Sequence, residues 1–266
     1  MLSRTPPGDG AILAPLTVLE ALAIFAAGVA AGTINTVVGS GTLITFPVLL
    51  AAGYAPVTAN VSNTIGLVPG SISGAIGYRA ELDGQRARAL HLGRASLLGG
   101  ITGAVLLLAL PPAAFKAIVP FFIVVALLLV VFQPRLATAL ARRRERHHPH
   151  GGPAALAGVF GTGVYGGYFG AAQGIMLLAV LGLTLDEDLH RINALKNVLA
   201  GIVNGVAGLV FLLVADVAWG PVALIAAGSI LGGQIGGRYG RRLPPAALRA
   251  LIVVVGIAAI AQLTLG

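Results

Sequence analysis

The sequence predicts an all-α polytopic membrane protein built from two inverted-topology repeats of about five helical elements each, with short broken or re-entrant second elements. Three observations support this prediction. First, 57% of the 266 residues are hydrophobic and 10% are charged, whereas an average soluble domain has about 25% charged residues. Second, the chain repeats itself at a shift of 133 residues. Third, the arginines behind the net charge of +8 fall in short clusters between apolar runs, as membrane topology requires.

The internal repeat appears in matching short motifs and polar positions. Segments 98–103 and 231–236 both begin Leu-Gly-Gly, and segments 110–117 and 243–250 both begin Leu-Pro-Pro-Ala-Ala. Three polar positions, Asn60, Ser71 and Asp83, have Asn193, Asn204 and Asp216 as counterparts at the same shift, while Gly32 and Gly39 match Gly163 and Gly170 at a shift of 131. We therefore divide the chain into a first membrane repeat (1–133), a cytoplasmic basic linker (134–152) and a second membrane repeat (153–266).

Five apolar elements are expected in the first half, at 16–38, 43–52, 57–78, 95–110 and 113–132. The first element follows a polar lead and stops at the glycine run that begins at Gly39. The second ends near Tyr54 and is shorter than the roughly 20 residues that a full crossing needs, so we expect a half-helix or re-entrant segment. The third ends before Arg79, where a basic loop begins that extends to Arg94, and a turn around Pro111 separates the fourth from the fifth.

The second half shows the same order, with elements expected at 153–169, 174–183, 189–214, 222–237 and 246–265. A glycine run beginning at Gly170 closes its first element. The second element is again too short to cross a membrane. Three acidic residues at 186–188 precede the third, and loops at 215–220 and 238–249 separate the last elements.

Charge predicts the orientation of these elements. The segments 79–94 and 134–152 carry nine arginines and lie two crossings apart, so both are expected in the cytoplasm, as is the segment 238–249. The counterpart of the first basic loop, 215–220, has no Lys or Arg. Equivalent loops would then face opposite sides, which requires an odd number of crossings per repeat. This predicts a multi-pass protein of the cell (plasma or inner) membrane with both termini outside.

Two matched breaks are the first candidate site. Gly39-Ser40-Gly41-Thr42 and Gly170-Ala171-Ala172-Gln173-Gly174 each interrupt an apolar stretch. Short, Gly/Pro-interrupted segments at corresponding places in two halves are typical of transporter binding sites. Half-helices that begin there would also point free N–H groups at an anion. The alternative is that these small residues only allow helices to pack closely.

Polar stripes on the third element of each half are the second candidate. Asn60, Asn63, Thr64 and Ser71 share one helical face, and the matched positions hold Asn193, Lys196, Asn197 and Asn204. Amides and a cation are costly against lipid, so this face should point inward, although Lys196 could instead be a lysine that snorkels to the interface. The predicted substrate-binding residues are Asn35, Gly39, Ser40, Gly41, Thr42, Asn60, Asn63, Thr64, Gly170, Gln173, Gly174, Asn193, Lys196, Asn197 and Asn204.

No motif in the sequence supports catalysis. The chain has no Cys, and it lacks the zinc-protease, nucleophile-elbow and Walker A motifs as well as a pair of intramembrane carboxylates. We therefore expect no enzyme activity, no cofactor and no metal site, and we read the histidines at 147, 148 and 150 as part of the charged linker. The expected partners are a small anionic solute and the lipid bilayer, without nucleic acid and with homo-oligomer formation left open.

The segments 32–47, 60–64, 165–174 and 193–197 resemble the sulfite exporter (TauE/SafE) family. The resemblance implies a plasma-membrane permease with two related halves, whose members are associated with export of sulfite, sulfonates and other small organic anions. The family's consecutive glycines are reduced here to Gly-Ser-Gly-Thr and Gly-Ala-Ala-Gln-Gly. The resulting expectation is a secondary transporter of small anions that works by alternating access. The alternative is a membrane-embedded scaffold or assembly protein without transport activity.

Overall fold

The computed structural model describes residues 16–142, 151–240 and 245–265, and every regular element in these ranges is helical. The first half contains α1 (Val18–Val37), α2 (Thr42–Ala51), α3 (Pro56–Gly77), the short 3-10 helix η1 (Arg79–Leu82), α4 (Arg86–Ala109) and α5 (Pro112–Arg142). The second half contains α6 (Gly152–Tyr168), α7 (Gln173–Thr184), α8 (Leu189–Val214), α9 (Trp219–Tyr239) and α10 (Pro245–Leu265). The predicted all-α class and order of elements are confirmed.

Six of the described helices are long and apolar enough to cross a membrane: α1, α4, α5, α8, α9 and α10. Helix α3 is also long, with 22 residues, but its polar stripe lowers its hydropathy. This set of helices supports a multi-pass membrane protein. Helices α2 and α7 have 10 and 12 residues, so neither reaches across a bilayer alone.

Two expected boundaries are wrong. The segment 79–94 is not a loop throughout, because it forms η1 and then the first turns of α4 from Arg86. Helix α5 continues through the start of the expected linker to Arg142. In both places Ala, Leu and Arg are frequent, and these residues favour helix regardless of charge. The histidines at 147, 148 and 150 lie outside the described residues.

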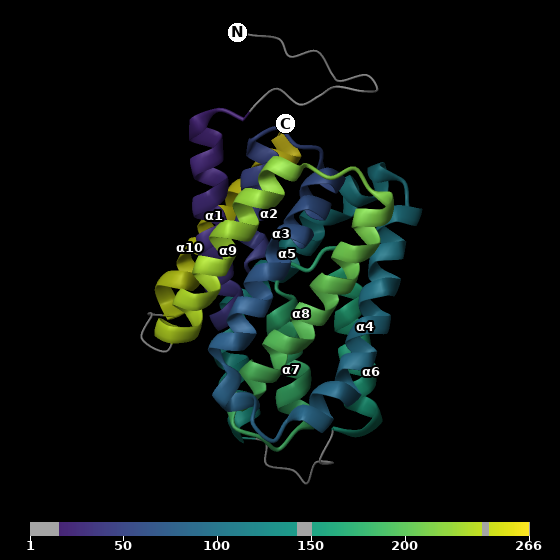
Figure 1. Cartoon of the computed structure of the whole chain (residues 1–266), viewed down its shortest axis with the longest axis vertical. Helices are drawn as coiled ribbons and strands as arrows, with labels where there is room; N and C mark the ends of the chain where they lie inside the picture. Colours follow the sequence, from purple (N-terminus) through teal and green to yellow (C-terminus); the bar gives the residue numbers. More distant parts are fainter. Residues whose placement is uncertain (1–15, 143–150, 241–244, 266) are drawn as a thin grey trace.

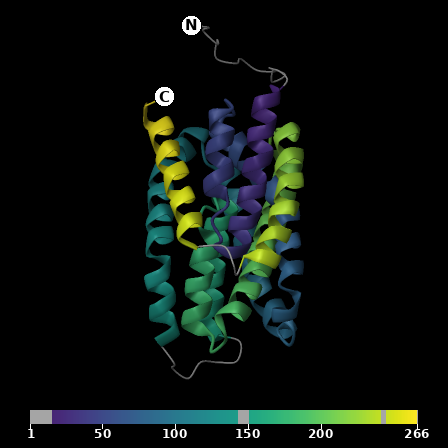
Figure 2. The same cartoon turned by 90° about the vertical axis from the view of Figure 1, so that its left-hand side faces the viewer.

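Each short helix forms a hairpin with the helix before it. Figure 1 shows α1 running from one end of the molecule to mid-height, where the chain turns and α2 returns toward the same end. Helices α6 and α7 form the corresponding hairpin from the opposite end. Figure 2 shows that the start of α1 and the end of α10 lie at one end, whereas α5 ends and α6 begins at the other.

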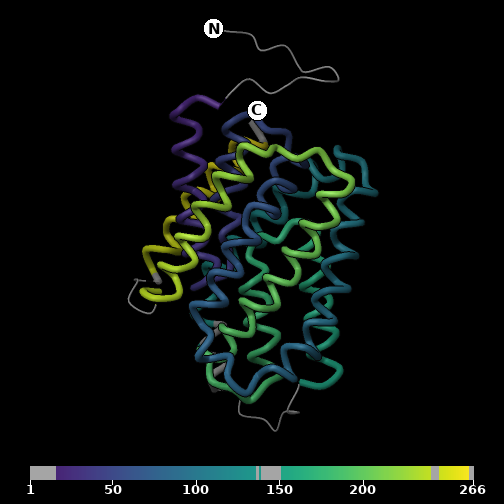
Figure 3. Tube along the Cα trace, viewed as in Figure 1, coloured from purple at the N-terminus to yellow at the C-terminus, as the bar shows by residue number. Residues whose placement is uncertain are grey.

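The longest helix interfaces join the two halves. Helix α1 packs on α9, α4 packs on α6, and α3 packs on both α8 and α9; the same arrangement can be followed in the Cα trace of Figure 3. Small residues allow this contact, since a Cβ at Gly32 would lie 2.4 Å from the Ser229 carbonyl oxygen and one at Gly103 would lie 2.0 Å from that of Val164. The close packing expected from the glycine content is therefore present between halves.

An aromatic cluster packs around α2, the helix that follows the turn at mid-height. Phe46 of α2 packs edge-on against Phe169, which follows α6, with ring centroids 5.2 Å apart, and against Phe115 of α5 at 6.4 Å. All three side chains are buried. Edge-to-face aromatic pairs contribute about 0.5–1.5 kcal/mol beyond their buried area. This cluster helps to fix α2, and hence the first break, against the second half.

Candidate functional site

The two predicted breaks meet in the middle of the molecule, backbone against backbone. Gly39 and Gly170, which occupy matched positions, have φ angles of +90° and +77°, a region that favours glycine because it has no Cβ. The Gly174 amide donates a hydrogen bond to the Gly39 carbonyl oxygen at 3.0 Å. A Cβ at Gly174 would lie only 2.4 Å from the Gly39 Cα. The break of each half therefore rests directly on the break of the other.

A narrow cavity of about 30 Å³ lies beside this contact, with room for about two water molecules. Its lining consists of Asn35, Thr36, Gly39, Thr42, Ser71, Gly170, Gln173, Gly174, Lys196, Asn197, Ala200 and Asn204. Nine of the fifteen predicted residues are in this lining. Thr36, Ser71 and Ala200 are additional; Ser71 belongs to the polar stripe, whereas Ala200 carries no polar group that could have marked it in the sequence.

Lys196 is buried in the wall of this cavity. Its side chain is 1% exposed, so the alternative of a lysine at the membrane interface is wrong. The ammonium nitrogen donates hydrogen bonds to the carbonyl oxygens of Asn35, at 3.0 Å, and Thr36, at 3.4 Å. These carbonyls lie in the last turn of α1, where the helix dipole is negative. Within the described residues Lys196 forms no ion pair, and a lysine ammonium has a third donor.

Two amides of the α8 stripe converge on the Thr36 carbonyl oxygen. The Nδ2 atoms of Asn193 and Asn197 lie 3.2 Å and 3.3 Å from it. In the first half, the buried Asn60 donates through Nδ2 to the carbonyl oxygen of Tyr168, the last residue of α6, at 2.9 Å. Asn60 and Asn193 are repeat counterparts. Each polar stripe therefore holds the end of the other half's first helix.

Six predicted residues lie outside the cavity lining: Ser40, Gly41, Asn60, Asn63, Thr64 and Asn193. Asn63 accepts a hydrogen bond from the Thr45 hydroxyl and donates to the Thr42 hydroxyl at 3.3 Å, which ties α3 to α2. The Thr64 hydroxyl bonds the carbonyl oxygen of Asn60, one turn earlier in its own helix, at 2.9 Å. The Asn63 contacts position the helix that follows the first break, and the Thr64 contact stays within α3.

The first amides of the half-helices are largely occupied. Asn35 Oδ1 accepts from the Gly41 amide at 2.7 Å, and the amides of Gln173 and Ile175 donate to the carbonyls of Gly170 and Ala172 at 3.2 Å and 3.0 Å. The expected row of free N–H groups at the start of α7 is therefore absent among these residues. The buried Nε2 of Gln173 has no hydrogen-bond partner within the described chain and is a donor at the cavity instead.

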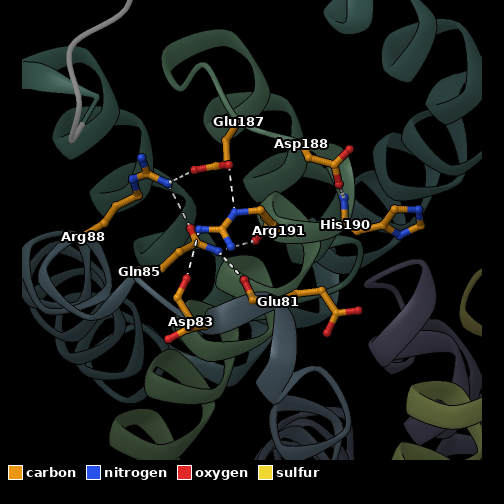
Figure 4. A network of polar contacts seen from close by, with 8 residues as sticks. All are labelled: Glu81, Asp83, Gln85, Arg88, Glu187, Asp188, His190 and Arg191. Carbon is orange, nitrogen blue, oxygen red and sulfur yellow. Dashed lines mark hydrogen bonds and ion pairs between the residues drawn. The ribbon is translucent and has the colours of Figure 1, made fainter.

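A second contact between the two halves lies at the end of the molecule where η1 leads into α4. Figure 4 shows Arg88 of α4 and Arg191 of α8 on either side of Glu187, each with an N···O distance of 2.8 Å. Gln85 donates to the Arg191 carbonyl oxygen at 3.0 Å, and Arg191 donates to that of Asp83 at 3.0 Å. This network, called the clasp below, consists of Asp83, Gln85, Arg88, Glu187 and Arg191. It joins the loop before α4 to the loop before α8.

Comparison with known proteins places the chain in a family. The family model described as "Sulfite exporter TauE/SafE" matches residues 24–263. The chain belongs to the TauE/SafE family. This confirms the resemblance inferred from the breaks and stripes, which both lie within the matched range.

Curated relatives agree with this TauE/SafE membership. "Probable membrane transporter protein YfcA" of Escherichia coli is 27% identical over 90% of this chain and 88% of the relative. A "Probable membrane transporter protein" of Haemophilus influenzae is 30% identical over 89% and 92%, and one of a Sinorhizobium species, ORF9, is 29% identical over 88% of each chain. No solved structure matches the chain significantly.

Proposed function

We propose that this TauE/SafE family member is a secondary membrane transporter that exports small anions, such as sulfite or organosulfonates, through the cavity between the two breaks. The observation that carries the proposal is Lys196, a buried cation in the cavity wall that has no ion pair within the described residues. A buried charge is costly unless a partner compensates it. A small anion beside the ammonium would supply that partner.

The other groups around the cavity suit an anion with several oxygens. Gln173 brings an Nε2 donor that has no partner among the described residues, and Asn197 and Asn204 bring further amides. None of the described residues that line the cavity is a carboxylate, so these residues would neither repel a negative charge nor favour a metal cation. Oxygen-rich anions accept several hydrogen bonds at once, and charge-assisted bonds are about twice as strong as neutral ones.

Transport through so narrow a cavity requires the halves to move against each other. The proposed motion is alternating access between two inverted-topology repeats, with the Gly39–Gly174 contact near the pivot. The contact between Asn204 Nδ2 and Ser71 Oγ, at 3.2 Å, joins two counterparts 133 residues apart, as expected close to a pseudo-two-fold axis. The clasp around Glu187 would have to open when the cavity faces that end.

Export is the proposed direction of transport, and the predicted orientation of the Arg-rich segments supports it. With the Arg-rich end in the cytoplasm of the cell membrane and the termini outside, a negative interior drives an anion outward, by about 2.3 kcal/mol per charge at 100 mV. Export would then need no intramembrane carboxylate to carry protons.

Ligand-dependent thermal stabilisation of the purified protein tests the binding site. Sulfite and a small sulfonate should stabilise the wild type progressively, by about 2.7 kcal/mol at one hundred times the dissociation constant. Lys196→Met should abolish this shift. Lys116→Met, which removes the chain's other lysine at an exposed position, should retain it. Equal stabilisation of all three proteins would contradict the proposed site.

A further inference from the structure

A large apolar groove lies beside the cavity. It has a volume of about 450 Å³ and is lined by Ser71, Ile72, Ala75, Ile76, Arg79, Leu82, Asn197, Val198, Gly201 and Ile202. Seven of these ten residues are apolar or glycine, and Ile72 and Ile76 are 56% and 50% exposed. The groove runs along α3 and α8 for about 12 Å, from Ser71 to Arg79.

The groove has two different ends. At mid-height, Ser71 and Asn197 belong both to the groove and to the central cavity, so the groove borders the cavity wall. At the other end, Arg79 is exposed, and its guanidinium makes no hydrogen bond or ion pair to the described residues. An apolar groove of this shape suits an acyl chain. The unpaired guanidinium at its end suits the anionic head group attached to that chain.

We propose that the groove binds an anionic phospholipid of the bilayer, with an acyl chain along α3 and α8 and the phosphate at Arg79. The guanidinium can bind phosphate oxygens through two parallel hydrogen bonds. Because Ile72 and Ile76 expose an apolar surface at the groove, a surrounding bilayer would bring lipid to it without a step through water. The chain tip would then cover Ser71 and Asn197 and seal the side of the central cavity. This assignment does not depend on which solute the protein transports.

The charge predicts a preference among lipids. One basic residue near a membrane surface attracts an anionic lipid about fivefold over a neutral one, and a zwitterionic head group has a positive group that Arg79 would repel. Glu81, two residues further along η1, is half-buried, and its side chain points away from Glu187 and Arg88 in Figure 4. The groove should therefore prefer anionic over neutral lipid by about fivefold, and this preference should depend on Arg79.

Fluorescence quenching can measure this occupancy directly. The chain has one tryptophan, Trp219, so Trp219→Phe combined with Ile76→Trp gives a single reporter in the groove. In phosphatidylcholine nanodiscs, a small fraction of chain-brominated phosphatidylglycerol should quench this reporter about fivefold more effectively than the same fraction of brominated phosphatidylcholine. A reporter made by Leu209→Trp, on the exposed face of α8 and outside the groove, should show no difference between the two lipids.

Two further variants identify the charge that is responsible. Arg79→Gln should remove the preference at the groove reporter, whereas Arg238→Gln, at an exposed arginine at the end of α9, should preserve it. Ile72→Trp offers a second reporter should Ile76→Trp fail to fold. Equal quenching by the two lipids with Arg79 present, or the same loss with Arg238→Gln, would overturn the proposal.

Discussion

Replacing Gly174 with Ala tests the contact between the two breaks. The added Cβ would lie 2.4 Å from the Gly39 Cα and 2.9 Å from the Gly39 carbonyl oxygen. Both atoms are backbone, so no flexible side chain can move aside. Overpacking of this kind costs about 1–3 kcal/mol. For a domain of this size that corresponds to a fall in unfolding temperature of roughly 2–12 °C.

Gly161→Ala is the matched control. Gly161 lies in α6, and a Cβ there would meet no atom within 4 Å. Within a helix this change should be neutral or stabilising by up to about 1 kcal/mol. Thermal unfolding in detergent, followed by the loss of the monodisperse chromatographic peak, compares the two variants. If Gly174→Ala unfolds at the wild-type temperature, the breaks do not touch as described.

Two further predictions concern polar contacts between the halves. Asn60→Ala leaves the buried Tyr168 carbonyl without its donor, which should lower the free energy of unfolding by about 1–3 kcal/mol. Thr102→Ala, at an exposed position, should be near neutral in the same unfolding assay. Equal effects of the two changes would contradict a stabilising role for the Asn60–Tyr168 hydrogen bond. Burial alone would raise the pKa of Glu187, but hydrogen bonds from Arg88 and Arg191, and their charges, lower it below the usual value of 4.5. The stability it adds is therefore fully present above about pH 4.5 and is lost as the pH falls through the lowered native pKa. The difference in unfolding temperature between wild type and Glu187→Gln should thus shrink on acidification, and a constant difference would refute this assignment.

The sequence predicted the helices, the two breaks and the polar stripes because each depends on local composition and spacing. Amides at Asn193 and Asn197 on one helical face had to point away from lipid, and they do contact protein. The sequence could not predict the common partner of these two amides. That partner is the backbone carbonyl of Thr36, and every residue has a backbone carbonyl. Helical spacing likewise could not separate residues that clamp a helix end, such as Asn60, from residues that line the cavity.

Membrane flux tests the central claim, that Lys196 lies in the path of a transported anion. Purified protein in liposomes loaded with sulfite or a small sulfonate should release the anion faster when a potential drives negative charge outward. Lys196→Met should reduce this flux at least tenfold, whereas Lys116→Met should leave it unchanged. Undiminished flux through Lys196→Met, or no flux of any tested anion through the folded wild type, would contradict the account.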